Sequence, residues 1–285
     1  GYRGGHPVAM TGLAGVALLM AGNTPQEGPQ VEAVSRAIDF LLAHQSSNGL
    51  FATPAEMSSA THAHGFAMLF LGLCYGMDTD AISRKRLAEA LNLAIGWSAR
   101  AQSKNGGWFY YANKEQDEGS TTVTIIQGLR ACRNAGLDVP RSIIDSAATY
   151  LEVCQQADGG ICYSFRSRGS SRPAISAAAV ATLYSAGEYD NPVAISCLNY
   201  LRKLLRSKGY NVKSAFQGHT YYAALYSAQA MWFAGEDDWD KFFPEVRDFL
   251  LGQGTWNGDH VGEVYGTAIG LIITQLPYER VPLFQ

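Results

Sequence analysis

Gln102-Ser103-Lys104-Asn105-Gly106-Gly107-Trp108 is the stretch of this chain that decides its fold. A glutamine followed four residues later by glycine returns at residues 45–51 and 155–161, and a degenerate copy lies at residues 253–258. The spacing of these copies indicates a repeat of about 50 residues, with one loop lost near residues 206–209. A repeat of this length is typical of stacked helix pairs, so it predicts the architecture before any single side chain is interpreted.

Each repeat contains two segments with different helical patterns. The first is apolar on most faces, as in helices enclosed by others, and usually ends at a glycine that can adopt the left-handed conformation. The second is amphipathic, as in Val31–His44, where Val34, Ile38 and Leu41 form one stripe. The first helices are predicted at residues 6–21, 58–75, 120–135, 174–186, 218–234 and 263–276, and the second at 31–44, 84–101, 142–154, 193–207 and 240–251.

Such helix pairs cannot bury their apolar faces alone, so they must stack or close on one another. Six inner and five outer helices predict an all-α, (α/α)6 toroid of about eleven helices, with residues 1–285 as a single domain. The sixth outer helix would either precede residue 1 or be replaced by the C-terminal tail. The loop at residues 169–173 is expected at the mouth of the ring.

Composition excludes several classes of protein. The formal net charge of −3 gives no basic surplus for phosphate contacts, which argues against nucleic-acid binding. No segment has 18 uninterrupted apolar residues, so no transmembrane helix is predicted. The five cysteines are odd in number and lack metal-site spacing, which argues against a disulfide framework. This cysteine usage is compatible with the cytoplasm, but a leader removed before residue 1 is an open alternative, and the compartment stays unknown.

The Gln-x-x-Asp/Asn-Gly-Gly-Trp loops resemble the QW repeats of the terpenoid cyclase and protein prenyltransferase superfamily, and nearly the whole chain fits. Residues 64–71, 221–232 and 264–278, with the closing segment 281–285, look closer to a bacterial branch known for prenyltransferase/squalene oxidase repeats. The resemblance implies an α/α toroid with a central cavity. It also implies a terpenoid-cyclase-like or isoprenoid-binding function, although one fold hosts unrelated chemistries.

Cyclases of this superfamily protonate an alkene with the middle Asp of an Asp-x-Asp-Asp motif, which is absent here. Asp117 and Glu118 precede a predicted inner helix and could form an acid pair. The alternative, which the pattern favours, is a helix N-terminus with Ser120 as its cap and the acids opposing the helix dipole. Glu118 is kept as the candidate catalytic acid.

Metal sites of related proteins are not reproduced. The stretch that matches the zinc site of prenyltransferases, residues 171–176, lacks the Asp and the Cys, and His219 alone is not a zinc site. Glu236-Asp-Asp-Trp-Asp240 has the wrong spacing for a magnesium motif, so we predict a solvated loop before an outer helix. The sequence predicts no metal and no cofactor.

Four of the six histidines lie near the predicted beginnings of inner helices. Polysaccharide lyases with α/α-toroid folds use His, Tyr and Arg to neutralise a uronate and to abstract a proton. His219, Tyr222 and Arg172 match these residue types, with His219 or Tyr222 as the base.

Three functional hypotheses remain open. The leading one is a terpenoid-cyclase-like protein, or a protein that binds an isoprenoid or another small apolar ligand, with aromatic side chains that could stabilise a carbocation. The second is an α/α-toroid polysaccharide lyase or hydrolase, and the third is a non-catalytic scaffold whose aromatics fill the ring. Protein partners are unknown. Beside Glu118, His219, Tyr222 and Arg172 as catalytic candidates, the residues expected to line the cavity are His6, His62, His64, Tyr221, Glu263 and Tyr265.

Overall fold

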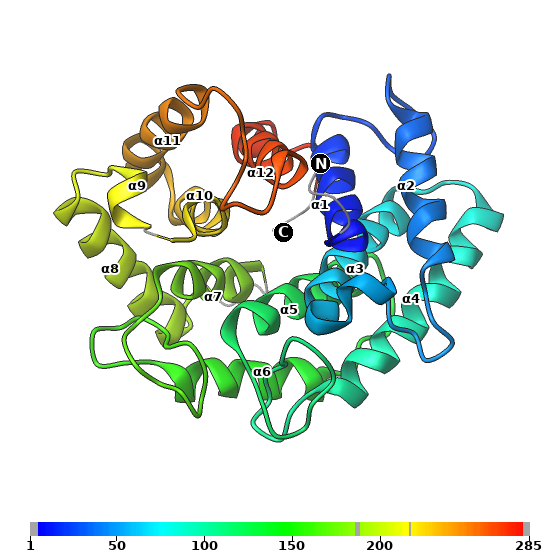
Figure 1. Ribbon diagram of the computed structural model, residues 1–285, viewed down its shortest axis with the longest axis horizontal. Helices are drawn as coiled ribbons and strands as arrows, with labels where there is room; N and C mark the ends of the chain where they lie inside the picture. Colours follow the sequence, from blue (N-terminus) through cyan, green and yellow to red (C-terminus); the bar gives the residue numbers. More distant parts are fainter. Residues whose placement is uncertain (1–4, 186–188, 217, 282–285) are drawn as a thin grey trace. The chain divides into compact units, whose positions relative to one another are not determined.

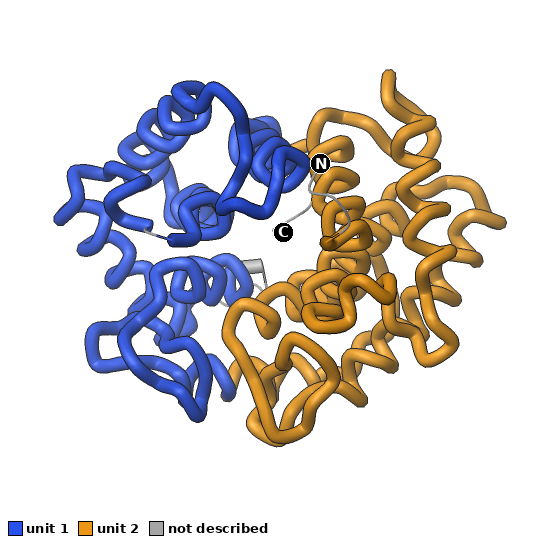
Figure 2. The backbone as a smooth tube through the Cα atoms, viewed as in Figure 1, with its two compact units in different colours: residues 1–2, 150–278, 284–285 blue, residues 3–149, 279–283 orange. Residues whose placement is uncertain are grey.

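The structure is a computed structural model that describes residues 5–185, 189–216 and 218–281. In these residues all regular secondary structure is helical, and the β-type contacts are isolated bridges within loops. Contacts between helices divide the chain into two compact units (Figure 2). Among the described residues, unit 1 lies within 150–278, and unit 2 comprises 5–149 with 279–281. The single domain expected from the sequence stays a prediction.

Unit 2 is built from two layers of helices (Figure 1). Three apolar helices, α1 (Pro7–Met20), α3 (Ala60–Met77) and α5 (Gly119–Asn134), pack side by side in that order. The amphipathic α2 (Val31–Ala43) covers α1, and α4 (Ala81–Ala101) covers α3. A short 3-10 helix, η1 (Pro54–Ser59), leads into α3, and α6 (Arg141–Cys154) begins in unit 2 and ends in unit 1.

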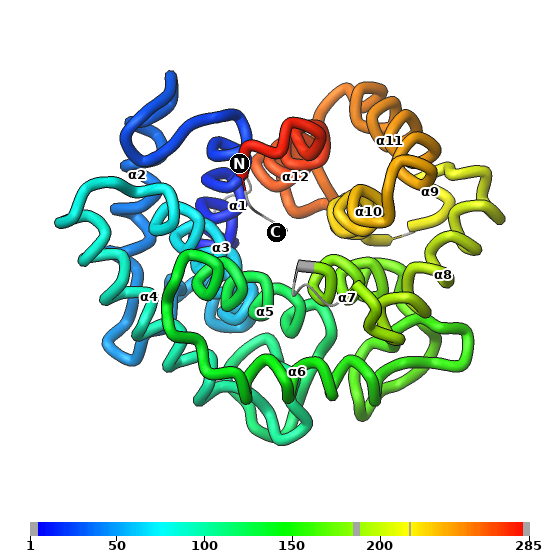
Figure 3. Tube along the Cα trace, turned by 180° about the vertical axis from the view of Figure 1, so that it is seen from behind, coloured from blue at the N-terminus to red at the C-terminus, as the bar shows by residue number. Residues whose placement is uncertain are grey.

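Unit 1 repeats this arrangement, as the view from behind also shows (Figure 3). The apolar helices α7 (Pro173–Ser185), α10 (Thr220–Ala234) and α12 (Glu263–Gln275) form one layer. The amphipathic α8 (Pro192–Ser207) covers α7, and α11 (Glu236–Leu251) covers α10. Two short helices, α9 (Val212–Ala215) and η2 (Leu276–Tyr278), complete the unit. The predicted alternation of apolar and amphipathic helices is confirmed in the described residues.

One predicted loop is helical instead. The acidic segment Glu236–Asp240, expected to be solvated, forms the first turn of α11. Acidic side chains are favourable in a first turn because the helix dipole is positive there. Asp238 is buried and accepts two hydrogen bonds from the Arg202 guanidinium, the shorter at 2.6 Å. The acidic run therefore begins a helix and fastens it to α8.

The glutamine of each clear loop copy bonds the loop to the next amphipathic helix. The amide of Gln102 donates to the carbonyl of Gly106 at 2.7 Å, inside its own loop, and to the carbonyl of Ile143 in α6 at 2.9 Å. One side chain therefore satisfies two backbone acceptors from different elements. Gln45 makes the same two bonds to Gly49 and Ala90, and Gln155 makes them to Gly159 and Val193.

The glycine of each loop lies against the same helix one turn further on. Gly106 has a φ of +93°, and a Cβ atom there would lie 2.1 Å from the carbonyl oxygen of Ser146. The loop backbone can approach α6 this closely only because the residue has no side chain. Gly49 meets Leu93 in α4 in the same way, and Gly159 meets Ser196 in α8. The recurring motif is thus a device that joins one repeat to the next.

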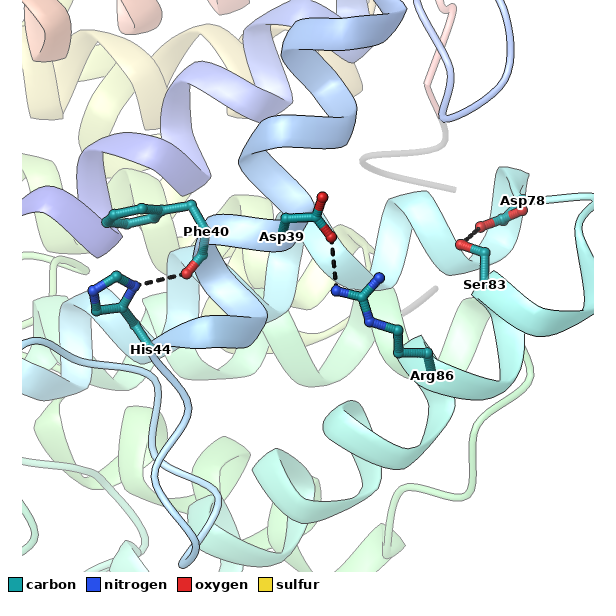
Figure 4. Close-up of polar contacts among 6 residues, drawn as sticks. All are labelled: Asp39, Phe40, His44, Asp78, Ser83 and Arg86. Atoms are coloured by element: carbon teal, nitrogen blue, oxygen red, sulfur yellow. Dashed lines mark hydrogen bonds and ion pairs between the residues drawn. The ribbon is translucent and has the colours of Figure 1, made fainter.

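Exposed polar contacts add smaller links within unit 2 (Figure 4). Arg86 on α4 bonds Asp39 on α2 at 2.7 Å, and the His44 ring donates to the carbonyl of Phe40 at 2.8 Å. Because Arg86 and Asp39 are more than half exposed, their pairing contributes about 0–1 kcal/mol. This exposed pair therefore adds little to the stability of unit 2.

Candidate active site

The candidate acid, Glu118, lies at the beginning of α5. Its backbone is extended and pairs with Trp108, whose carbonyl accepts from the Glu118 amide at 2.8 Å. This geometry turns the carboxylate over the first turn, where Oε2 accepts from the Thr121 amide at 3.0 Å. Glu118 is therefore the N-cap, and the prediction that Ser120 has this role is wrong, because α5 begins at Gly119 and Ser120 already lies in its first turn.

Ser120 connects Glu118 to a histidine on the neighbouring helix. The Ser120 hydroxyl donates to Glu118 Oε2 at 2.5 Å, and His62 Nε2, in the first turn of α3, lies 3.1 Å from the same hydroxyl. When Glu118 is ionised, Ser120 donates to it and His62 donates to Ser120. When Glu118 is protonated, both bonds can reverse, because a hydroxyl both donates and accepts. The three side chains therefore form a path along which a proton can move.

Burial shifts the pKa values of Glu118 and His62 in the directions that favour their uncharged forms. Burial raises the pKa of Glu118, and the hydrogen bonds from Ser120 and Thr121 oppose this only in part. Burial and, to a smaller extent, the nearby His6 lower the pKa of His62 to about 4. His6 itself lies 3.3 Å from the Ser59 hydroxyl through Nδ1. A buried acid that resists ionisation beside a neutral imidazole is an arrangement suited to donating a proton.

Aromatic side chains border this polar row. The Tyr110 ring lies 5.7 Å from the His62 ring, and Phe109 packs its edge against both Tyr110 and Tyr111. The Tyr110 carbonyl accepts from the Thr61 amide at 3.0 Å, which holds the aromatic segment at the beginning of α3. Tyr111 is 44% exposed, so this aromatic segment is partly accessible to solvent.

Asp117 does not share the surroundings of Glu118. Its Oδ2 accepts from the Asn105 side chain at 2.9 Å, which ties the loop of Gln102 to the beginning of α5. The two carboxylates therefore have different hydrogen-bond partners. This is the arrangement expected if they stabilise the beginning of α5 and do not form a catalytic acid pair.

His64, predicted to line a cavity, is fully buried within unit 2. Its Nδ1 accepts from the Phe51 amide at 3.1 Å, and its Nε2 lies 3.2 Å from the Ala94 carbonyl. In the two later repeats the same loop amide donates to Thr122 and Ser176 instead, which occupy the matching helix position. His64 thus accepts a hydrogen bond that recurs in the later repeats and joins a loop to the helix that follows it.

This histidine should make stability depend on pH. Burial lowers the pKa of His64 to about 3, whereas the unfolded side chain titrates near 6.5. The unfolded state then binds more protons between these values, so the free energy of unfolding should fall as the pH drops from about 6.5 towards 4. Urea unfolding at a series of pH values measures this slope. We expect His64→Gln to make the slope shallower while the contribution of His62 remains, and an unchanged slope would contradict the assignment.

Glu56 is a buried carboxylate that the sequence reading missed. Its Oε1 accepts from the amides of Val8 and Ala9 in α1, and its Oε2 accepts from the amide and hydroxyl of Thr53. The group therefore caps α1 from a segment nearly fifty residues away. The Thr-x-x-Glu signature of a capping box was the available signal, although it predicts only the bonds to Thr53.

A second cluster of predicted residues forms in unit 1 around Asp259, which the sequence reading also missed. The carboxylate accepts from the amides of Tyr221 and Tyr222 at 3.0 and 2.9 Å, and so caps α10. The Tyr265 hydroxyl lies 3.4 Å from Oδ2 of the same group. Burial raises the pKa of both Tyr221 and Tyr265, and Asp259 adds to this effect. Asp259 thus joins the loop before α12 to α10.

The other unit 1 candidates lie at separate positions along the chain. His219 is an exposed residue at the N-cap position of α10, where its ring makes no capping bond. Arg172 is exposed directly before α7, and Glu263 is the exposed first residue of α12. Among the ten predicted residues, His62 is connected to Glu118 through Ser120, and His6 lies near His62. Tyr221, Tyr222 and Tyr265 all contact Asp259, the first two through their backbone amides.

Two kinds of site are absent from the described part of the chain. In residues 5–185, 189–216 and 218–281, no three His, Cys, Asp or Glu side chains are grouped so that they could hold a metal ion. Over the same residues, no helix combines the length and apolar character needed to cross a membrane.

Comparisons with known proteins give the fold. No protein-family model and no curated protein sequence matches this chain. A solved α-amylase from Clostridium perfringens aligns with a TM-score of 0.67 and 13% identity, over 94% of this chain and 85% of that one. The type II terpene cyclase MstE from Scytonema, bound to geranylgeranyl dihydroxybenzoate, aligns with a TM-score of 0.51 and 16% identity, over 88% of this chain and 80% of that one.

These similarities extend over most of the chain, and they are too low in identity to carry an activity. The chain therefore has an all-α, α/α-toroid fold, and the predicted resemblance to terpenoid cyclases is confirmed at the level of the fold.

Proposed function

We propose that this protein is an acid catalyst of the terpenoid-cyclase type, with Glu118 as the proton donor. The observation that carries the proposal is the row Glu118–Ser120–His62, in which burial raises the pKa of the acid. Protonation of an alkene needs a carboxyl group that stays neutral until the substrate arrives. The similarity to a cyclase bound to a geranylgeranyl compound supports an isoprenoid as the substrate class.

The proposed reaction is an isomerisation that consumes no proton overall. The Glu118 O–H bond breaks, and the alkene electron pair takes up the proton, which leaves a carbocation on the neighbouring carbon. Further alkene electron pairs close the rings, and the Tyr110 ring face can stabilise positive charge near the acid. Loss of a proton from the final cation forms the product alkene. Solvent water accepts the proton lost from the cation, and a proton from solvent returns to Glu118 through His62 and Ser120, because both side chains can accept and donate.

A second candidate function is glycoside hydrolysis, with Glu118 protonating the leaving oxygen. The solvent-exposed Tyr111 favours it, because sugars stack on exposed aromatic rings, and so does the similarity to an α-amylase. Most glycosidases also need a second carboxylate, about 5–10 Å from the acid. Asp117 is the nearest carboxylate in sequence, and its bond to Asn105 occupies one of its oxygens.

The variant Glu118→Gln tests both candidates. The Ser120 hydroxyl and the Thr121 amide both donate to Oε2 of Glu118, so a glutamine can keep the cap through its amide oxygen while it loses the acidic proton. Turnover should fall by about 10²-fold or more, because general acid catalysis contributes at least that much. Ser120→Ala, which breaks the path but keeps the acid, should cost less. The assay uses squalene, prenylated aromatic acids and starch, with product detected by mass spectrometry.

The outcomes separate the proposals. Isoprenoid cyclisation that Glu118→Gln abolishes supports the cyclase, and starch cleavage that it abolishes supports the hydrolase. Activity that survives the substitution in a protein of unchanged stability would overturn the role of Glu118 in both.

A further inference from the structure

Unit 1 carries an arginine-rich loop that the proposed catalysis does not use. Between Gly159 and Pro173 the chain contains Arg166, Arg168 and Arg172 and no acidic residue. The whole chain, in contrast, has a net charge of −3. Positive charge is therefore concentrated in this segment, residues 163–172, which we call the arginine loop.

Two of the arginines lie over aromatic rings of the same loop. The Arg168 guanidinium lies 5.5 Å from the Phe165 ring centre, and the Arg172 guanidinium lies 6.0 Å from that of Tyr163. Both arginines are exposed, and Phe165 is 36% exposed. A ring under a guanidinium restrains its plane and leaves its N–H edges available to an acceptor. The pairs are therefore partly preorganised donors for an anion.

The base of the arginine loop is fastened to the preceding turn. The Ser171 hydroxyl donates to Asp158 at 2.5 Å, and the Asp158 carboxylate also accepts from the Gly160 amide. The Arg172 amide donates to the Ile161 carbonyl at 2.8 Å. Asp158, the nearest acid before the loop in sequence, is thus engaged at the base. A fixed base lowers the entropy that binding must overcome.

We propose that the arginine loop binds the acidic sugar units of an anionic polysaccharide. Carboxylate or sulfate groups would accept from the edges of Arg168 and Arg172, and sugar C–H faces would pack on the exposed part of Phe165. The combination of charge with aromatic surface favours an acidic sugar over a simple ion. A nucleic acid is disfavoured, because its binding requires a broad basic surface and this chain is acidic overall.

The test is binding of the full chain to soluble polymers, measured by isothermal titration calorimetry at about 0.1 M salt, where charged contacts act over about 10 Å. The probes are polygalacturonate, heparin, neutral dextran and a single-stranded oligonucleotide. The double variant R168Q/R172Q should weaken binding of the acidic polysaccharide by about tenfold or more, because charge-assisted hydrogen bonds are lost. Phe165→Leu keeps the charge and should cost a smaller factor.

The matched control is R36Q/R141Q, which removes two exposed arginines of α2 and α6 and changes the net charge equally. Binding to polygalacturonate or heparin that only the loop variants weaken supports the proposal. Equal loss in the control, equal binding of dextran, tighter binding of the oligonucleotide, or no binding of either acidic polysaccharide would overturn it. The readout needs no catalysis and leaves Glu118 intact, so it fails or succeeds independently of the proposed function.

Discussion

Replacement of Gly106 by alanine is expected to lower the free energy of unfolding by about 3–5 kcal/mol. Two effects add. The φ of +93° is unfavourable for any residue with a side chain, and the new Cβ atom would lie 2.1 Å from the carbonyl oxygen of Ser146. The neighbouring atom belongs to a helix backbone, which cannot turn aside as a flexible side chain would. The loop must therefore leave α6, and the two bonds of Gln102 are disturbed with it.

Gly136 provides the matched control for this substitution. Its φ is +94°, nearly identical to that of Gly106, but no heavy atom lies within 4 Å of the position that a Cβ would occupy. Gly136→Ala should therefore cost only the backbone term, about 1–2 kcal/mol. Urea unfolding of both variants isolates the contact with α6 as their difference. Equal losses would mean that the loop can move away from the helix at little cost, and the proposed junction would then be wrong.

The repeat was predictable because its signals are local. Helix periodicity, terminating glycines and the Gln-Gly spacing each occupy a few consecutive residues, so one sequence carries them fully. The apolar helices and their amphipathic neighbours accordingly lie where the sequence predicts them. The acidic beginning of α11 differs, because its charged residues looked solvated while the partner that buries Asp238, Arg202, lies 36 residues away.

The candidate site was predictable only as separate residues. His62 and Glu118 attract notice because each lies at the beginning of an apolar helix. Nothing in the sequence shows that Ser120 lies between them, because His62 and Ser120 are 58 residues apart. The capping carboxylates Glu56 and Asp259 were missed for the same reason, since each accepts from amides of a different helix. Long-range partners of buried polar groups are specified by the packing of helices and leave little local pattern.

The second large effect is expected at Glu56, where even the near-isosteric Glu56→Gln should lower the free energy of unfolding by about 1–3 kcal/mol. Both carboxylate oxygens act as acceptors, Oε1 for Val8 and Ala9 and Oε2 for Thr53. A glutamine amide has one acceptor oxygen, so its NH₂ group must face donors at one of these places. The amides of Val8 and Ala9 lose their acceptor in one orientation of the new side chain, and the Thr53 amide loses it in the other, where the Thr53 hydroxyl can reverse and accept. At least one backbone donor is therefore unpaired in a buried position, where unpaired polar groups are costly.

The variant Glu118→Gln is the matched control for Glu56→Gln. The bonds that Glu118 accepts from the Ser120 hydroxyl and the Thr121 amide both fall on Oε2, so an amide oxygen can keep them, and we expect a loss below about 1 kcal/mol. Urea unfolding compares the global stabilities, and hydrogen exchange read by mass spectrometry reports on the α1 amides that Glu56 caps. Protection of the first turn of α1 should fall in Glu56→Gln and stay unchanged in Glu118→Gln. Equal stability of the two variants would show that the cap of α1 does not depend on Glu56, because the two substitutions differ in how many donors they leave without an acceptor.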